Sequence, residues 1–248
     1  MKKNEKLTKD LEVARPILER AMRGIEPTPM EKFQLIKMLC ANMHTSGKIE
    51  GIFSIDSSAS GCSFCAKMQE AAEKIGDDHI CKHCYARKGR FLMEAVKDRH
   101  MLNMAILSIV EFEIIDFAPL GLSGFGRINA DGDFENVTHV KNVLRIMYAN
   151  PFGRFTVWTK NVADTIAATD EVGKPSNAIY VASSPIIGKA IALPKYFDYT
   201  FTVYRKDQIA KAIECGGMEC NGKKCKECGF KCYKGEWKNG SNICEVLR

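Results

Sequence analysis

The sequence predicts an α/β protein whose largely parallel sheet forms a partial or open (β/α) barrel. Short apolar strand patterns alternate with helical patterns at intervals of roughly 20 to 30 residues in the second half of the chain, which is the spacing of strand–helix–strand units. Right-handed crossovers would curl such units towards a barrel. Helices at the N-terminus and a cysteine-rich, metal-binding segment at the C-terminus are predicted to flank this core.

Three regions follow from these patterns. Residues 1–48 are predicted to be helical, because apolar residues recur at helical spacing over 7–22 and again over 29–43, where Pro29 opens the second helix. Residues 49–213 form the α/β core. Residues 214–248 form the cysteine-rich segment, which is predicted to bind metal.

The core is predicted to begin with a strand over 51–56, followed by a small-residue loop and a cysteine-rich loop over 62–84. A helix is predicted over 92–115. Further strands are predicted over 125–129, 155–159, 178–182 and 199–204, and the helices between them over 136–148, 162–169 and up to 213. Five or six strands are too few for a closed eight-stranded barrel.

The composition indicates a cytoplasmic protein. The chain has 248 residues and can bury a full core without cross-links. Its charged N-terminus lacks the apolar stretch of a secretory signal, and no apolar run is long enough to span a membrane. Because cytosolic thiols remain reduced, closely spaced cysteines are expected to be metal ligands rather than disulfides.

Ten of the eleven cysteines fall into two regions. The N-terminal region has two Cys-x-x-Cys pairs separated by fifteen residues, which is typical of zinc sites: Cys62, Cys65, Cys81 and Cys84. His79 and His83 lie beside the second pair. They are interpreted as solvated loop residues, with replacement of a cysteine as metal ligand as the alternative. Cys40 stands apart and is predicted to be a core residue.

The C-terminal region carries more thiols than one tetrahedral zinc requires. Its predicted ligands are Cys215, Cys220, Cys225, Cys228, Cys232 and Cys244. The spacing from Cys220 to Cys228 matches the start of a plant-type ferredoxin loop, and the spacing onwards to Cys232 partly matches the bacterial cluster run. An iron–sulfur cluster, most simply 4Fe-4S, is therefore the favoured cofactor, with zinc as the alternative.

Polar residues follow the predicted strands, at the edge where α/β proteins build their active sites. Arg127, Asp131, Asp133 and Lys160 are the candidate catalytic pocket, with Asp133 as a base or ligand anchor. Arg205, Ser183 and Ser184 are candidates for cofactor or ligand binding, and Lys160 and Arg205 are expected to receive a small anionic ligand. Asp56 and Thr159 also end predicted strands. For the serines, capping of the next helix is an equal alternative.

The net charge of +6 includes a run of lysines near the C-terminal cysteines. These are Lys223, Lys224, Lys226, Lys231, Lys234 and Lys238. A nucleic-acid contact is one interpretation. The favoured interpretation is that the cations offset the negative charge of thiolate–metal centres or simply solvate a loop. The expected partner is an electron-transfer protein or a small anionic ligand.

The chain resembles the phage "gene product 88" family in three motifs that occur in order between about residues 50 and 232. These are Cys84-Tyr85-Ala86, Gly132-Asp133-Phe134 after an arginine-bearing strand, and an aromatic strand that ends in Thr159-Lys160. Asn129 stands where the family often has histidine or serine. The resemblance implies a metal- or iron–sulfur-binding phage protein in the host cytoplasm, without an assigned reaction.

A looser resemblance is to radical S-adenosylmethionine enzymes, which also place a cluster-binding loop after the first strand of a partial barrel. Their Cys-x3-Cys-x2-Cys signature is absent here. Three hypotheses therefore stand: an iron–sulfur protein with a redox or catalytic role, a zinc-stabilised module that binds nucleic acid or protein, and a radical S-adenosylmethionine-like enzyme.

Overall fold

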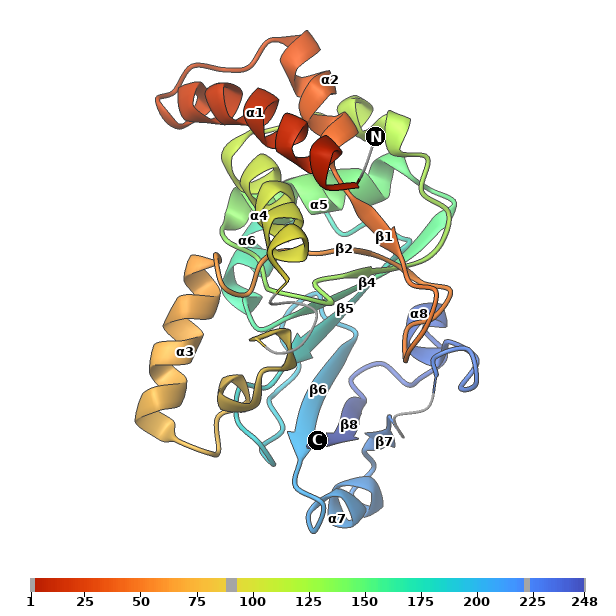
Figure 1. Cartoon of the computed structure of the whole chain (residues 1–248). Helices are drawn as coiled ribbons and strands as arrows, with labels where there is room; N and C mark the ends of the chain where they lie inside the picture. Colours follow the sequence, from red (N-terminus) through yellow and green to blue (C-terminus); the bar gives the residue numbers. More distant parts are fainter. Residues whose placement is uncertain (1–2, 88–92, 221–223, 248) are drawn as a thin grey trace.

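The computed structural model describes residues 3–87, 93–220 and 224–247, which form an eight-stranded sheet with flanking helices (Figure 1). The strands run in the order β1-β2-β3-β4-β5-β6-β8-β7. β1 is antiparallel to β2, and the other neighbouring pairs are parallel. From β1 to β8 the bounds are Ala41–Met43, Phe53–Ile55, Gly124–Ile128, Gly153–Thr159, Ala178–Ser183, Tyr199–Tyr204, Met218–Glu219 and Asn242–Val246. The predicted α/β class with an open, largely parallel sheet is confirmed.

The N-terminal helices are α1 (Lys3–Met22) and α2 (Pro29–Met38). Thr28 caps α2 in a capping box, and Pro29 occupies its first turn. The predicted extension of this helix to residue 43 is wrong, because β1 occupies residues 41–43 and pairs with β2. The Asn103 side chain holds the break by accepting from the Cys40 N–H at 2.9 Å and donating to the Cys40 carbonyl at 3.0 Å.

The predicted loop over 62–84 contains regular structure. It folds into α3 (Ser63–Ile75) and the 3-10 turn η1 (Ile80–His83), and a second turn, η2 (Tyr85–Arg87), follows. The helix predicted over 92–115 is observed as α4 (Glu94–Ile109), and η4 (Ile114–Leu120) comes after it. Leu92, the predicted start, lies outside the described residues, as does Lys223.

The remaining helices alternate with the parallel strands, as predicted. α5 (Val137–Ala149) joins β3 to β4, and α6 (Val162–Val172) joins β4 to β5. α7 (Ile209–Glu214) follows β6. Because β2 to β6 are parallel and adjacent in chain order, their carboxyl ends all lie at one edge of the sheet. The predicted polar strand ends therefore share this edge.

Helices cover one face of the sheet, here named the helix face. Ile128 of β3, Val157 of β4 and Tyr180 of β5 lie side by side in register on this face. They belong to one apolar core with residues from α1, α2, α4, α5 and α6. No helix in the described ranges is both long and apolar enough to cross a membrane.

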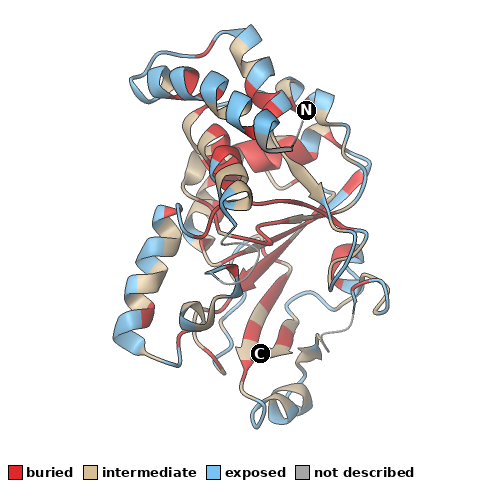
Figure 2. Ribbon diagram, in the orientation of Figure 1, coloured by how far each residue is buried: buried red, intermediate tan, exposed pale blue. Residues whose placement is uncertain are grey.

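The opposite face, here named the cysteine face, is covered by the C-terminal segment. Phe125, Trp158 and Val181 project from it, and a second apolar cluster joins them to Cys225, Cys232 and α8 (Lys231–Lys234). The segment also contributes β8, which pairs with β6 and extends the sheet. Figure 2 shows buried residues concentrated along the sheet between these two coverings. The cysteine-rich segment is thus part of the packed core.

Candidate functional site

The first cysteine group, Cys62, Cys65, Cys81 and Cys84, lies at the carboxyl edge of the sheet. Cys62 is the N-cap of α3, and its Sγ accepts from the Cys65 N–H at 3.4 Å. The same sulfur lies 3.6 Å from the carbonyl oxygen of Asp133, directly after β3. The first Cys-x-x-Cys pair is therefore attached to the turn that carries the predicted catalytic aspartates.

The second pair of this group docks against the loops after β5 and β6. The Ile80 N–H donates to the Pro185 carbonyl at 2.8 Å, and the Ile187 N–H donates to the Asp78 carbonyl at 2.7 Å. Arg205, at the end of β6, donates to the Asp78 carboxylate at 2.8 Å. In this structure the predicted ligand-binding Arg205 holds the cysteine-bearing loop in place.

The two serines after β5 differ in surroundings. The Ser184 hydroxyl donates to the Lys189 carbonyl at 2.7 Å and accepts from the Ile186 N–H at 3.2 Å, so it closes the turn against which the second cysteine pair docks. Ser183 is buried at the end of β5.

Lys160 lies among the first cysteine group, directly after β4. Burial opposes its charge, but interactions with Cys81, Asp133, Cys84 and Cys65 outweigh that cost and raise its pKa. The pKa of Cys65 is raised, first by its hydrogen bond with Cys62 and then by burial. Lys160 is therefore a positive charge positioned to balance thiolates.

Asp133 is buried, and protein groups occupy both of its carboxylate oxygens. The Thr159 hydroxyl and the Phe134 N–H donate to Oδ1, and the Lys160 N–H donates to Oδ2 at 2.8 Å. Burial is the main reason that its pKa is raised. In this arrangement Asp133 ties the end of β3 to the end of β4 beneath the first cysteine group.

The second cysteine group comprises four of the six predicted C-terminal ligands. Cys220, Cys225, Cys228 and Cys232 interact electrostatically with one another. Burial is the main cause that raises the pKa of Cys225 to about 11 and that of Cys232 to about 12. The Cys225 N–H donates to the Lys48 carbonyl at 2.8 Å, which fastens the group to the turn before β2.

Cations and aromatic rings surround the second cysteine group. Arg127 of β3 interacts with Cys225 and Cys232, and Lys48 interacts with Cys220. The Arg127 guanidinium lies 4.6 Å from the centre of the Trp158 ring. Phe125 stacks on Phe230 at 4.6 Å and meets Tyr233 edge-on at 5.7 Å, and the Tyr233 hydroxyl is near Thr156. This arrangement is apolar and positively charged, which suits an anionic metal centre.

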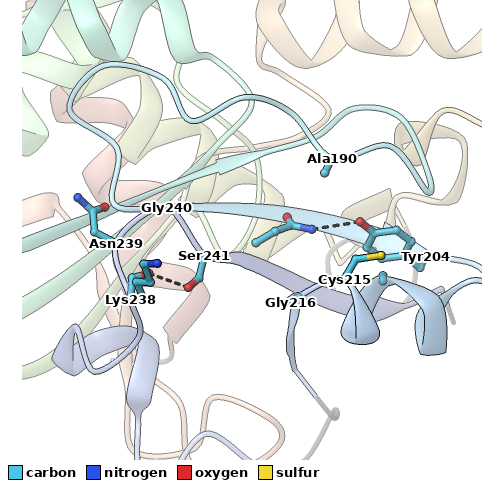
Figure 3. Close-up of a pocket in the computed structure, with 11 residues that line it drawn as sticks. Ala190, Tyr204, Cys215, Gly216, Lys238, Asn239, Gly240 and Ser241 are labelled. Atoms are coloured by element: carbon cyan, nitrogen blue, oxygen red, sulfur yellow. Dashed lines mark hydrogen bonds between the residues drawn. The ribbon is translucent and has the colours of Figure 1, made fainter.

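The structure separates the other two predicted ligands from this group. Cys244 follows Ile243 in β8, so its side chain points to the opposite face of the sheet from Ile243, which packs with Cys225 and Cys232. Cys215 is exposed and lines a pocket of about 440 Å³ (Figure 3). In that pocket the Asn242 side chain donates to the Tyr204 hydroxyl at 3.1 Å.

The donor sets suit a soft metal or an iron–sulfur cluster, because each group offers four cysteines beside a cation. Within residues 3–87, 93–220 and 224–247, no three cysteine, histidine or carboxylate side chains are arranged to hold a metal ion. Metal binding would therefore require these sulfurs to lie closer together than they do in this structure. Residues 221–223, between Cys220 and Cys225, lie outside the described ranges.

A buried polar cluster beside the first cysteine group includes residues that sequence analysis missed. His100 Nδ1 lies 2.7 Å from the Asp131 carboxylate, and His100 Nε2 lies 3.9 Å from that of Asp56. The Ser54 hydroxyl donates to Asp56 at 2.5 Å, and His44 Nε2 lies 2.7 Å from the same hydroxyl. The signal in the sequence was His100 itself, a histidine among the apolar residues of α4, which would have indicated a buried polar contact.

The fold and site define an open-sheet α/β protein with one four-cysteine group at the carboxyl edge of the sheet and another on its cysteine face. The sequence model described as gene product 88 matches residues 20–230. The chain therefore belongs to the gene product 88 family. Neither the curated proteins nor the solved structures gave a significant match.

Proposed function

We propose that this protein is an iron–sulfur protein whose cluster is held by Cys220, Cys225, Cys228 and Cys232. The observation that carries the proposal is that these four thiols interact electrostatically with one another and with Arg127 and Lys48, where the C-terminal segment covers the cysteine face. A bound cluster would supply reversible one-electron chemistry. The protein's own side chains would provide ligands, positive charge and an apolar cover.

Charge balance supports a thiolate-bound centre. Four thiolates around a metal create negative charge that is costly to bury without nearby cations. Arg127 interacts with Cys225 and Cys232, and Lys48 interacts with Cys220. Because the pKa of Cys225 and of Cys232 is raised, metal uptake would release protons and is expected to strengthen as pH rises.

The ligand count favours a closed centre over one with an open metal site. Four cysteines saturate a cluster, whereas three would leave one iron available to substrate. Cys215 and Cys244 lie apart from the group, so the apparent surplus of thiols does not indicate a second cluster there. This arrangement favours electron transfer or structural stabilisation over radical S-adenosylmethionine chemistry.

The first cysteine group is proposed as a second metal centre. Its two Cys-x-x-Cys pairs have the spacing of zinc sites, and Lys160 would balance their charge. If both groups hold zinc, the protein becomes a zinc-stabilised binding module instead. The cysteine-rich segment would then be a structural cover and a surface for a partner.

Protein purified without oxygen should contain matched iron and acid-labile sulfide and absorb broadly near ~400 nm. Cys225→Ala removes one ligand of the second cysteine group and should reduce iron and sulfide to background if this group holds the only cluster. The measurement is metal and sulfide analysis together with the visible spectrum. Stoichiometric zinc without sulfide would contradict the iron–sulfur proposal and support the binding module.

Cys244→Ala is the matched control, because Cys244 is also buried but faces the other side of β8. This variant should retain the full iron and sulfide content of the parent protein. Equal loss of metal in both variants would show that the assignment of ligands is wrong.

A further inference from the structure

Three buried N–H donors without acceptors lie at the end of β3 and on β4. They are Arg127 Nε, Asn129 Nδ2 and Trp158 Nε1, none of which has a hydrogen-bond partner within the described residues. A buried donor without an acceptor costs about 1–3 kcal/mol. Two of these donors lie on the neighbouring strands β3 and β4 and the third directly follows β3, so acceptors from outside the chain would remove this cost.

The strand register brings two of these donors together. Arg127 of β3 pairs with Thr156 of β4, and Trp158 lies two residues further along the same face. The guanidinium lies over the Trp158 ring at 4.6 Å from its centre, which orients both groups. Arg127 and Trp158 are therefore a preorganised pair on the cysteine face.

The third donor, Asn129 Nδ2, belongs to a side chain whose position is fixed by the backbone conformation and by a hydrogen bond to its Oδ1. Asn129 follows β3 directly and adopts a left-handed conformation with φ of 59°. Its Oδ1 accepts from the Ser57 hydroxyl at 3.3 Å, which leaves Nδ2 as the unsatisfied end of a side chain that is only 5% exposed. The amide is thus fixed by a contact with the loop that leads to Cys62.

The chemistry of the set selects a class of ligand. All three groups donate, and Arg127 adds a positive charge, so the complementary partner is an acceptor-rich anion. The other predicted anion-binding residues are engaged elsewhere: Arg205 with Asp78, and Lys160 with the first cysteine group. A carboxylate or phosphate group offers several acceptor oxygens together with the negative charge that complements Arg127.

We propose that Arg127, Asn129 and Trp158 form a binding site for a small oxyanion, either a carboxylate or a phosphate group. The site lies between the two cysteine groups, because Arg127 interacts with Cys225 and Cys232 on one side and with Tyr85, which follows Cys84, on the other. The proposal adds a ligand to the proposed metalloprotein. It shares Arg127 with the proposed cluster site but depends on N–H donors rather than on the thiols. Oxyanion binding therefore does not require a loaded cluster.

Trp237→Phe provides a reporter protein, because the chain has two tryptophans and Trp158 then remains alone. The new ring preserves the aromatic contact that Trp237 makes with Tyr199. The reporter is titrated with sodium phosphate, sodium acetate and, at equal ionic strength, sodium chloride, in both metal-free and metal-loaded forms. In both forms, phosphate or acetate is expected to cause a saturable change in Trp158 fluorescence, and chloride is not. The anion that binds more tightly identifies the ligand group as phosphate or carboxylate.

Arg127→Gln in the reporter should weaken binding of that anion at least tenfold, because a charged donor is lost. Arg154→Gln is the matched control, since Arg154 lies exposed on β4, and it should bind like the reporter. If Arg127→Gln does not fold, Trp158→Phe in the natural chain removes the N–H but keeps a ring. That variant should bind the anion several-fold more weakly by calorimetry.

Three results would overturn the proposal. The first is the absence of saturable binding of phosphate and acetate in both metal states. The second is equal binding by the reporter and by its Arg127→Gln variant. The third is binding that disappears when metal is loaded, which would assign these donors to the metal centre. Because iron, zinc and sulfide are measured separately, none of these results would by itself refute the iron–sulfur proposal.

Discussion

Gly132→Ala should lower the free energy of unfolding by at least about 3 kcal/mol and reduce the metal content of the first cysteine group. Gly132 has φ of +72°, which costs a residue with a side chain roughly 1–2 kcal/mol. A Cβ at this position would also lie 2.6 Å from the Ser57 carbonyl oxygen. Because Ser57 begins the loop that leads to Cys62, the backbone shift should displace that ligand. Urea unfolding and metal analysis measure both effects.

Gly76→Ala separates backbone strain from the steric clash. Gly76 has φ of +82° at the end of α3, but an added Cβ would meet no atom within 4 Å. Because Gly76 has ψ of −146°, a region that is essentially restricted to glycine, this variant should lose roughly 1–3 kcal/mol from backbone strain alone and keep its metal content. Equal destabilisation by the two substitutions would refute the close contact between Gly132 and Ser57.

His139 should make the protein less stable as pH falls from neutral to about 5. Burial lowers its pKa from 6.5 to about 3, because the folded environment disfavours the charged ring. The contribution to stability is complete above pH 6.5, where the unfolded-state histidine is neutral, and is lost as pH falls towards 3. By linkage the loss at pH 5 is about 2 kcal/mol. Urea unfolding at pH 7 and pH 5 measures it.

His139→Gln removes the titrating group and should reduce the loss between pH 7 and pH 5 by about 2 kcal/mol relative to the natural protein. The Glu135 N–H donates to His139 Nδ1 at 3.3 Å, and the glutamine oxygen offers a substitute acceptor. His83→Gln is the control, because that ring is half-buried at the surface turn η1. All three proteins are compared in the same metal state. An unchanged pH dependence in His139→Gln would refute the assignment.

The helices and strands of the core could be predicted, because the spacing of apolar residues that marks each element depends only on residues close together in the sequence. Apolar residues at helical spacing mark α5, and β-branched and aromatic residues mark β4 and β6. The end of α2 could not be predicted, because Asn103, sixty-three residues away, holds the backbone of Cys40. β8 was missed because it is stabilised by β6, and the pattern within residues 242–246 is too short to indicate a strand.

The candidate site was predictable in its residue types and less so in their roles. Spacing drew attention to the cysteines, and the strand-end rule placed Lys160 and Asp133 at the carboxyl edge. In the structure, three donors occupy the Asp133 carboxylate, and Arg205 is paired with Asp78. Contacts between loops decide which polar groups remain free to bind a ligand, and the sequence does not show those contacts. His100 meets Asp131 across thirty-one residues, and no local pattern encodes that contact.

The order and spacing of residues alone determined the α/β class and the concentration of thiols in two regions. They also determined that the polar residues after the parallel strands lie at the carboxyl edge of the sheet. These features depend on side-chain periodicity and on residue type, which are present in the chain before it folds. Only the tertiary structure decided that Cys244 faces away from Cys225, and that Arg127, Asn129 and Trp158 each keep a buried donor without a partner in the described part of the chain. Such groupings depend on strand register and on which face each side chain takes, and those are set when distant segments pack together.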